Sequence, residues 1–578
     1  LFPYTTLFRS GGVCVAKYSY DAHGLCTEKE IARGGRTARI TYTYDAHGRC
    51  AGRTLSDPDN AEGAYTEKYE YDTQGRLIKL TSPDGKETCI SYTAKTETVL
   101  FPGGLERRLT YDGRKNLVLV EETDRKRGQK LSVYCEYDKS HHVTKRVYSE
   151  RDRTLVTEEM SYNGRGDLAS VTTSAAGDGT KKRQLLSYDG AGRLASVRIQ
   201  KIGPDGRVED ETESKASFRY IGAGRELTLT SGERRASTIY SDGLGRLVKQ
   251  TDALGEEFTK TLSPAGRLLS ESSSHGGMYA YGYDALGLLA AAGEEGKEQS
   301  KADCNPDGSV KKTTDRLGNV TEYFYDVRGL LIKQVSPDGT GLYGYDISGR
   351  LTEFRRGSLR VRYEYSDDGR TVTVTRGDSV TETLETDAWG RIIKSTDGEE
   401  NSRTYTRDAL GRLTDEADAY GNETSYRYNA WGRVSEIILP DGSREGYEYN
   451  ALGLPVRKID SEGTAWERRY DRDGLLLEEK SRARAVREYA YDALGRLTEV
   501  RSGGETQARY EYTAYGRKET LIRAGESRYE KAFDAYGRLV SETDSQGATR
   551  TFAYDAEGRV RERKSFGGNV TDRRASCR

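Results

Sequence analysis

The sequence predicts an all-β fold made of repeated β-hairpins. A glycine returns at a nearly fixed spacing from Gly224 to Gly558, and two tyrosines that stand two residues apart precede many of these glycines. A second turn signal, such as the one from Asp418 to Gly421, follows about ten residues after the first. Because turns this close leave no room for a helix of ordinary length, each repeat holds two extended segments and two reversals.

The glycine spacing indicates a repeat protein. Seventeen glycines define sixteen intervals, of which fourteen are 21 residues long and two are 20. A constant period in this range is typical of repeat architectures. Two units together approach the length of a four-stranded propeller blade, but adjacent units show no odd-and-even alternation. We therefore take a single hairpin as the repeating unit.

Each recurring residue of the unit has a structural reason. The two tyrosines lie on one face of an extended strand, because side chains alternate along it. Asp or Asn three residues before the glycine accepts hydrogen bonds from the turn, and the glycine supplies the positive φ of a short hairpin loop with a bulge. An arginine follows the glycine in 12 of the 17 units. In two well-formed units the repeat-defining residues are Tyr426, Tyr428, Asn429, Gly432 and Arg433, and Tyr489, Tyr491, Asp492, Gly495 and Arg496.

The composition favours a thin wall. Apolar residues make up 34% of the chain and charged residues 32%, and 41 of the 578 residues are tyrosines. A single-layer sheet wetted on both faces needs little aliphatic core, because tyrosine rows and cross-strand pairs stabilise it. We therefore expect a curled single-layer sheet and not a filled sandwich.

The unit Y-x-Y-D-x-x-G-R-L, written out from Tyr489 to Leu497, resembles the YD repeats of the Rhs family, which also occur in Tc toxin shell components and in teneurins. The resemblance covers the chain from Tyr18 to about Arg559. It implies a spiral array of β-hairpins that forms part of a hollow shell around a toxic C-terminal domain, which self-cleavage at a D-P-x-G motif releases. This chain contains no Asp-Pro-x-Gly, so neither the cleavage element nor the cargo is assigned to it.

We expect four segments along the chain. Residues 1–10 resemble the in-frame translation of a sequencing-library adapter and are left out of the fold prediction. Residues 11–224 hold irregular YD repeats, and residues 225–563 hold regular 21-residue repeats that continue the same sheet. Residues 564–578 form the tail, where we take the sequence to be a fragment of a longer bacterial protein. Because repeat arrays need caps, the uncapped terminal hairpins should make this fragment associate or aggregate.

The sequence indicates no catalytic residue, cofactor or metal site. The seven cysteines include no C-x-x-C pair, which disfavours a zinc site or a disulfide framework. His23 and His47 fall at turn tips, and His141 and His142 stand alone, whereas a metal site needs several converging ligands. No nucleophile, base and orienting carboxylate form an isolated set. We therefore expect a protein that is not an enzyme.

The leading hypothesis is a non-catalytic shell (cocoon) segment of an Rhs-type polymorphic toxin. It would encapsulate a C-terminal toxin domain of the same parent polypeptide, meet secretion-apparatus proteins, and be secreted or held at the cell surface. The 91 basic and 92 acidic residues nearly cancel, which argues against a nucleic-acid partner. No run approaches the ~18 apolar residues of a transmembrane helix.

The alternative is a cell-surface adhesion or carbohydrate-binding scaffold built from the same repeats. Its glycan-stacking residues would be Trp389, Trp431 and Trp466. Trp389 and Trp431 lie just before a repeat glycine, which favours packing within the turns or between hairpins over glycan stacking.

Overall fold

The computed structural model describes residues 5–10, 13–33, 35–57, 60–177, 179–232, 234–274, 276–297, 299–513, 517–566 and 570–572. Within these residues the chain forms 52 strands and no helix, so the predicted all-β fold class is confirmed. Strands that are consecutive in the sequence pair antiparallel, as in β1 with β2 and β2 with β3. The result is an array of hairpins laid out in the order of the sequence.

The hairpin of β44 (Arg484–Tyr491) and β45 (Leu497–Ser502) shows the standard geometry. Arg487 lies opposite Ser502 and Ala490 opposite Glu499, and the register then shifts so that Tyr491 faces Leu497. This shift is the bulge expected from a glycine with positive φ at the end of a three-residue loop, and Gly495 has φ 79°. The Asp-x-x-Gly signal therefore fixes both the turn and the register.

The first twenty strands vary most in length, from the five residues of β7 to the fourteen of β18. Their bounds are β1 Thr5–Ser10, β2 Val13–Tyr20, β3 Cys26–Arg33, β4 Arg36–Tyr44, β5 Cys50–Asp57, β6 Asn60–Tyr71, β7 Leu77–Thr81, β8 Glu87–Tyr92, β9 Thr96–Leu100, β10 Leu105–Tyr111, β11 Leu117–Asp124, β12 Gln129–Tyr137, β13 Val143–Glu150, β14 Arg153–Tyr162, β15 Leu168–Ala175, β16 Lys181–Tyr188, β17 Leu194–Ile202, β18 Val208–Ile221, β19 Gly224–Ser231 and β20 Arg234–Ser241.

The later strands are shorter, with at most the eight residues of β34. Their bounds are β21 Leu247–Asp252, β22 Glu257–Leu262, β23 Leu268–Ser273, β24 Met278–Tyr283, β25 Leu289–Glu294, β26 Ser300–Cys304, β27 Val310–Thr314, β28 Val320–Tyr325, β29 Leu331–Ser336, β30 Gly339–Tyr345, β31 Leu351–Arg356, β32 Leu359–Tyr365, β33 Thr371–Arg376, β34 Ser379–Thr386, β35 Ile392–Asp397, β36 Ser402–Arg407, β37 Leu413–Ala417, β38 Glu423–Tyr428, β39 Val434–Ile438, β40 Arg444–Tyr449, β41 Pro455–Asp460, β42 Gly463–Tyr470, β43 Leu476–Ser481, β44 Arg484–Tyr491, β45 Leu497–Ser502, β46 Glu505–Tyr512, β47 Lys518–Arg523, β48 Arg528–Phe533, β49 Leu539–Thr543, β50 Thr549–Tyr554, β51 Val560–Lys564 and β52 Val570–Asp572.

One of the repeat glycines does not sit where the spacing places it. Gly224 is the first residue of β19, and the reversal before it is made by Gly222, with φ 57°, and Ala223. Ile221 stands where 13 of the 17 repeats have Asp or Asn, so no side-chain acceptor is present to organise the longer loop. Residues 5–10, which the sequence analysis set aside, form β1 and pair with β2.

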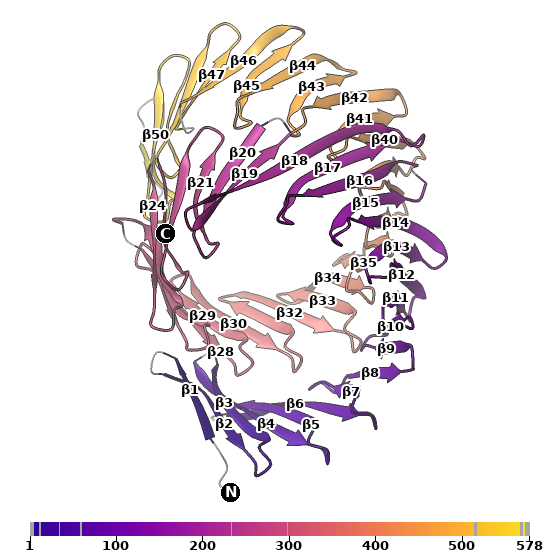
Figure 1. Ribbon diagram of the computed structural model, residues 1–578. Coiled ribbons are helices and arrows are strands. Elements are labelled where there is room, and N and C mark those ends of the chain that lie inside the picture. Colours follow the sequence, from indigo (N-terminus) through magenta and orange to yellow (C-terminus); the bar gives the residue numbers. More distant parts are fainter. Residues whose placement is uncertain are drawn as a thin grey trace. The chain divides into compact units, whose positions relative to one another are not determined.

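Contacts within the chain divide it into two compact units, and each is described by itself. Unit 1 contains Leu1–Leu155, Gly282–Ala291 and Ser300–Ser425, and unit 2 contains Val156–Tyr281, Ala292–Gln299 and Tyr426–Arg578. We call the two long parts of each unit its early and late stretches. In unit 1, β10 to β12 of the early stretch lie beside β34 and β35 of the late stretch (Figure 1).

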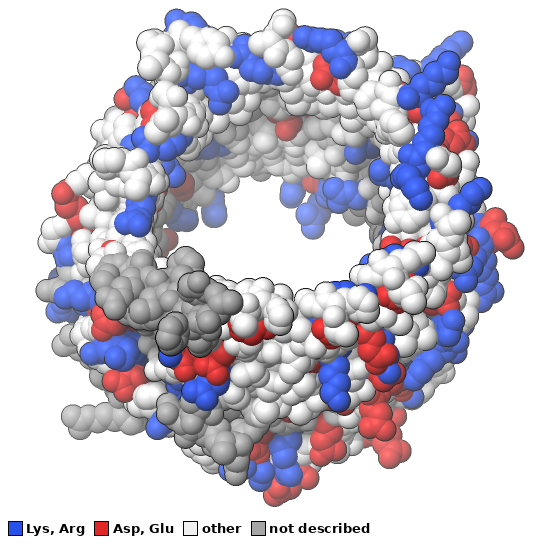
Figure 2. Space-filling view, turned by 60° about the horizontal axis from the view of Figure 1, so that its bottom comes forward, with Lys and Arg blue, Asp and Glu red and all other residues white. Residues whose placement is uncertain are grey.

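Few side chains are fully buried, as the composition predicts. Among the described residues only 11 hydrophobic side chains fall in the buried class. The one core cluster joins Ala38, Ile40, Leu55 and Val327. On the face shown in Figure 2, lysine and arginine alternate with aspartate and glutamate and form no large region of one sign. The described residues contain no apolar helix of membrane-spanning length.

Candidate functional site: the repeat turns and the seams between stretches

The aspartate of the repeat organises each turn. Asp492 Oδ1 accepts the N–H groups of Leu494 at 2.9 Å and Arg496 at 3.0 Å, and its Oδ2 accepts Arg496 Nε at 2.7 Å. In the main chain, the Gly495 N–H donates to the Asp492 carbonyl, and the Asp492 N–H donates to the Arg496 carbonyl, both at 3.0 Å. Only the N–H of Ala493, directly after the aspartate, takes no part in these bonds. The turn therefore keeps one outward donor.

These bonds change the acidity of the aspartate. Burial alone would raise the pKa of Asp492, but the hydrogen bonds from the Arg496 side chain and backbone outweigh it and lower the pKa below its usual value. The same Asp–Arg bond, four residues apart, recurs in both units. The pairs are Asp45–Arg49, Asp72–Arg76, Asp189–Arg193, Asp242–Arg246, Asp346–Arg350, Asp387–Arg391, Asp408–Arg412, Asp534–Arg538 and Asp555–Arg559.

Asparagine performs the same backbone role without the charge. Asn429 Oδ1 accepts the N–H groups of Trp431 and Arg433, both at 3.0 Å, and Gly432 has φ 69°. Tyr426 and Tyr428 end β38, directly before this turn. The turn therefore depends on the side-chain acceptor at this position, and the ion pair with arginine is an addition to it.

The arginine and the second tyrosine connect one repeat to the next. The Arg496 guanidinium lies over the Tyr512 ring of the following repeat, 4.3 Å from its centre, and the Tyr512 hydroxyl donates to the Leu497 carbonyl at 2.8 Å. Tyr491 likewise donates to the Leu476 carbonyl of the repeat before it, at 2.9 Å. The first tyrosine contacts a side chain of the same preceding strand, since the Tyr489 hydroxyl donates to Glu479 Oε2 on β43 at 3.4 Å. The two tyrosines of a repeat thus have different partners.

The turns also define the two edges of each stretch. We call the edge with the Asp-x-x-Gly turns after the tyrosine pair the YD edge, and the edge with the second turns the distal edge. In both units the distal edge of the early stretch meets the YD edge of the late stretch, and we call this contact a seam. The residues that form the seams are not among those predicted from the sequence.

The seam of unit 1 centres on a buried ion pair. Asp124, at the end of β11 on the distal edge, accepts Arg370 Nη1 and Nη2, each at 2.9 Å, and the N–H of Ala388 at 3.0 Å. The Asp124 side chain is 0% exposed and that of Arg370 10%. Burial alone would raise the pKa of Asp124, but the bonds from Arg370 and Ala388 lower it. Next to it, Trp389 Nε1 donates to Glu122 Oε2 at 2.8 Å.

Further polar contacts extend the unit 1 seam along the same edge. Asp84 Oδ2 accepts the Ser348 hydroxyl at 2.7 Å, and Gln129 Nε2 donates to the Arg407 carbonyl at 2.8 Å. Lys126 pairs with Asp368. The apolar part is the cluster in which Val327, directly after the aspartate of its turn, packs against Ala38, Ile40 and Leu55 of β4 and β5.

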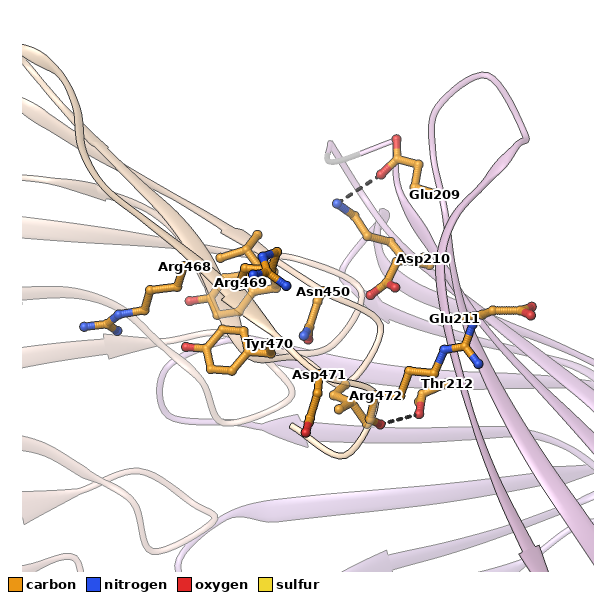
Figure 3. A pocket seen from close by; sticks show the side chains of 14 residues that line it. Glu209, Asp210, Glu211, Thr212, Asn450, Arg468, Arg469, Tyr470, Asp471 and Arg472 are labelled. Atoms are coloured by element: carbon orange, nitrogen blue, oxygen red, sulfur yellow. Dashed lines mark hydrogen bonds and ion pairs between the residues drawn. The ribbon is translucent and has the colours of Figure 1, made fainter. Parts of the chain in front are cut away.

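The seam of unit 2 repeats this arrangement with other residues. Asp210 Oδ2 on β18 accepts the Ala451 N–H at 2.7 Å. The Thr212 hydroxyl donates to the Arg472 carbonyl at 2.8 Å (Figure 3). In the short segment Ala292–Gln299 of the same unit, Glu294 accepts Arg538 Nη1 at 3.2 Å, and the Glu294 side chain is 2% exposed. Ala388 and Ala451 are both the residue directly after the turn acceptor. A distal-edge carboxylate therefore takes the one outward N–H of a YD turn in both units.

A cavity of about 300 Å³ lies at the unit 2 seam, between β18 and the turns before β41 and β43 (Figure 3). Its charged lining residues are paired with their neighbours. Lys201 contacts Glu209 at 3.0 Å, Arg468 contacts Glu479 at 2.9 Å, and Arg469 contacts Glu478 at 3.5 Å. The cavity is thus a part of the seam.

The other residues singled out in the sequence have local partners. His142 Nδ1 contacts Asp138 at 3.0 Å and His141 Nδ1 contacts Asn116 at 2.5 Å, while His23 and His47 sit exposed at turn tips. Cys26, Cys50, Cys89, Cys135 and Cys304 are free thiols, and the side chains of Cys14 and Cys577 lie outside the described residues. Searching the described residues reveals no cluster of three or more possible metal ligands.

The tryptophans pack against their own chain. Trp431 Nε1 donates to the Ala451 carbonyl at 3.1 Å, and Trp389 is held by Glu122 as described above. The Arg468 guanidinium lies 4.2 Å from the centre of the Trp466 ring. Two of the three tryptophans therefore belong to the turns, as their positions before the glycine suggested.

Comparison with known proteins agrees with the repeat type. The family model described as Teneurin YD-shell matches residues 12–122 and 446–572, and the one described as RHS Repeat matches residues 305–340 and 387–423. The Double-stranded DNA deaminase toxin A of Burkholderia cenocepacia is 27% identical over 178 residues, which are 30% of this chain and 11% of that protein.

Solved structures of Tc toxin proteins share the fold. A TcdB2-TccC3-Cdc42 crystal structure has a TM-score of 0.62 at 12% identity, over 97% of this chain and 41% of that one. A TcdB2-TccC3-TEV crystal structure has a TM-score of 0.55 at 14% identity, over 96% of this chain and 35% of that one. The chain thus spans well under half the length of these relatives.

Proposed function

The chain belongs to the RHS/YD-repeat family, and from this premise we propose that it is a non-catalytic wall segment of a toxin shell that encloses a C-terminal toxic cargo domain of the same parent polypeptide. The parent protein would be secreted or displayed at the cell surface, where secretion-apparatus proteins are its further partners. The toxin relative and the Tc toxin structures support this assignment through family and fold.

The observation that carries the proposal is the constant sequence distance across the seams. Bonds across the unit 1 seam join residues 242 to 278 positions apart, and those across the unit 2 seam join residues 241 to 260 positions apart. A sheet that coils with a fixed number of hairpins per turn gives this constancy. From the Asp84 turn to the Ser348 turn, and again from Asp210 to the Ala451 turn, the chain passes through 23 strands, between 11 and 12 hairpins, with neighbouring strands about 4.8 Å apart. This regularity is what a wall that winds around a cargo domain requires.

The adhesion or carbohydrate-binding alternative has less support. Its stacking residues would have to be exposed aromatic faces, whereas the indole N–H groups of Trp389 and Trp431 are bonded within the chain. A glycan-array experiment with this chain and its Trp466→Ala variant tests it. Binding that is lost in the variant would favour the alternative over the shell.

Small-angle X-ray scattering tests whether the wall is hollow. A solid globule of 578 residues has a radius of gyration of about 25 Å. We expect a clearly larger value for this chain, with a distance distribution skewed to long distances. A value at the solid-globule level would contradict a hollow wall.

Limited proteolysis of the natural full-length parent tests the cargo. We expect the domain that follows these repeats to resist trypsin in the intact protein and to be digested when it is expressed alone. Equal digestion rates in the two forms would contradict encapsulation while leaving the wall itself in place.

A further inference from the structure

A second cavity, of about 360 Å³, lies at the seam of unit 1. Gly35, in the turn between β3 and β4, and Arg36, the first residue of β4, line it from the early stretch. Asn305, the first residue of the YD turn after β26, and residues 311–312 and 322–325 of β27 and β28 line it from the late stretch. The two walls meet closely, because a Cβ atom added to Gly35 would lie 2.9 Å from Asn305 Oδ1. The volume of the cavity is in the range of ligand-binding pockets.

The cavity lies where a repeat lacks its arginine. In several repeats the arginine after the glycine covers the second tyrosine of the next repeat, and Arg350, for example, lies 4.4 Å from the centre of the Tyr365 ring. In the repeat before Tyr325 this position is serine, and the Ser309 hydroxyl accepts a hydrogen bond from Asn305 Nδ2 at 2.9 Å. The Tyr325 ring, which lines the cavity, is therefore without the guanidinium that covers Tyr365.

The tyrosine face of the sheet carries a cation at this cavity. The hydroxyl groups of Thr313 and Tyr323 are 3.4 Å apart, so these two side chains share a face. Lys311, two residues from Thr313, and Tyr325, two residues from Tyr323, lie on the same face because side chains alternate along a strand. Glu322 is the one acidic residue among the described residues that line the cavity, and it alternates to the opposite face.

The groups that remain for a ligand are one lysine and the tyrosine rings. Lys311 is exposed and has no ion-pair partner in the described part of the chain, and Arg36 adds a second cation to the lining. The Tyr325 hydroxyl donates to the Val310 carbonyl at 2.8 Å, and the Tyr323 hydroxyl is bonded to a threonine. The tyrosines therefore offer ring surface and not hydroxyl groups. An anionic group suits the lysine, and a flat ring suits the tyrosines.

We propose that this cavity binds a small carboxylate that carries a six-membered ring, with the carboxylate at Lys311 and the ring against Tyr325. Acidic sugars and aromatic acids share this chemistry. The ligand ring takes the place that a guanidinium occupies in the other repeats. The site does not depend on what the wall encloses. Because the contact between carboxylate and ammonium is exposed to solvent, salt should weaken the binding.

Ligand-observed NMR titrations of the full chain test the site with two probes, glucuronate for the acidic sugars and benzoate for the aromatic acids. Glucose and benzamide are the matched neutral ligands. Lys311→Gln removes the cation, and Ser309→Arg places a guanidinium over Tyr325, where the ligand ring would lie. Lys301→Gln, which changes an exposed lysine on the neighbouring strand β26, is the control. Circular dichroism confirms the β content of every variant.

We expect at least one of the two carboxylates to bind the unmodified chain and the Lys301→Gln variant equally, and its neutral analogue to bind at least about tenfold more weakly. Lys311→Gln should weaken the binding about tenfold, and Ser309→Arg should abolish it while the β content is kept. Binding of glucuronate alone would identify the ligand as an acidic sugar, and binding of benzoate alone as an aromatic acid. No binding of either carboxylate, equal binding of the neutral ligands, or undiminished binding in either cavity variant would each overturn the proposal.

Discussion

At the YD turns that carry Asp or Asn, a single side-chain acceptor makes the hydrogen bonds that hold the turn. Asp492 receives two backbone N–H groups and one guanidinium, and Asn429 receives the same two N–H groups without the ion pair. The acceptor bonds turn N–H groups that have no partner in the β-ladder. Because a hydroxyl oxygen can accept the same bonds, Ser and Thr can also stand three residues before the repeat glycine. The difference in stability between Asp and Asn at this position therefore measures the contribution of the ion pair with arginine.

Replacing Asp492 tests this division of roles. Asp492→Ala removes the acceptor of two N–H groups and should destabilise the local hairpin by about 1–2 kcal/mol, whereas Asp492→Asn keeps both bonds and should cost well under half of that. Amide hydrogen exchange over residues 484–502 measures the effect, because repeats open locally. Equal losses of protection in the two variants would show that the ion pair, and not the acceptor, holds the turn.

Arg370 is the residue on which the unit 1 seam should depend most. Arg370→Ala leaves the Asp124 carboxylate buried without its cation, and we expect a loss of about 3–5 kcal/mol in the stability of the seam. Arg559→Ala removes an Asp–Arg pair within a single turn, where the arginine side chain is 57% exposed, and should cost at most about 1 kcal/mol. Chemical denaturation followed by tryptophan fluorescence reports the difference, since Trp389 lies at this seam. Similar costs for the two variants would mean that burial does not strengthen the Asp124 pair.

The hairpin is the unit of construction, and its arginine supplies the coupling to the next hairpin. Arg496 bonds Asp492 in its own repeat and stacks on Tyr512 in the next, while the Tyr512 hydroxyl caps Leu497 of the first. The residues that recur in every repeat therefore include those that join neighbouring hairpins as well as those that form the turn. In a repeat array such nearest-neighbour terms set the cooperativity.

A double-mutant cycle should detect this coupling. We expect Arg496→Ala and Tyr512→Ala to be coupled by about 0.5–1 kcal/mol, the range for an exposed cation–π contact. Arg496→Ala with Tyr92→Ala, two residues in different units, is the control and should be additive. The coupling is read from hydrogen exchange of β46. If the effects of Arg496→Ala and Tyr512→Ala are additive, the stacking of Arg496 on Tyr512 does not couple neighbouring repeats.

The sequence predicted the hairpins because their determinants are local. Asp, Gly and the tyrosine pair lie within nine residues, from Tyr489 to Leu497, so period and turn chemistry identify the fold class. The seams were missed because Asp124 and Arg370 are 246 positions apart and sit in turns that look ordinary. The residue after the turn acceptor does not mark a seam either, because alanine follows the acceptor both at Ala388 and Ala451, which lie at a seam, and at the exposed Ala46.

At the scale of the whole molecule, each unit is held by two kinds of contact. Ladders and turn bonds join neighbouring hairpins, and seams join stretches about 240–280 residues apart. The seams involve fewer contacts, since each depends on a small number of carboxylates, to which the unit 1 seam adds one small apolar cluster. The carboxylates are the groups whose charge solvent conditions can change.

Acid should weaken the unit 1 seam through Asp124. Its pKa is lowered in the folded chain, so its contribution is complete above the unfolded value of about 3.9 and is lost as the pH falls through the lower folded value. We expect stability to be level from pH 7 to about pH 5 and to fall below about pH 4. The pKa values of Asp84 and Asp368 at the same seam are also lowered, which adds to the fall.

The variant Asp124→Asn assigns this acid dependence to the seam. At neutral pH it should cost about 3 kcal/mol, because Arg370 is left without its counter-charge, and the cost should shrink as the pH approaches 2, where Asp124 itself becomes neutral. Denaturant unfolding at pH 7, 4 and 2.5 measures the cost. Asp378→Asn, on an exposed turn, is the control, and its acid profile should match that of the unmodified chain. A cost of Asp124→Asn that stays constant over this range would mean that the Asp124 ion pair does not hold the seam, and the stability of unit 1 would then have to come from its ladders and its apolar cluster.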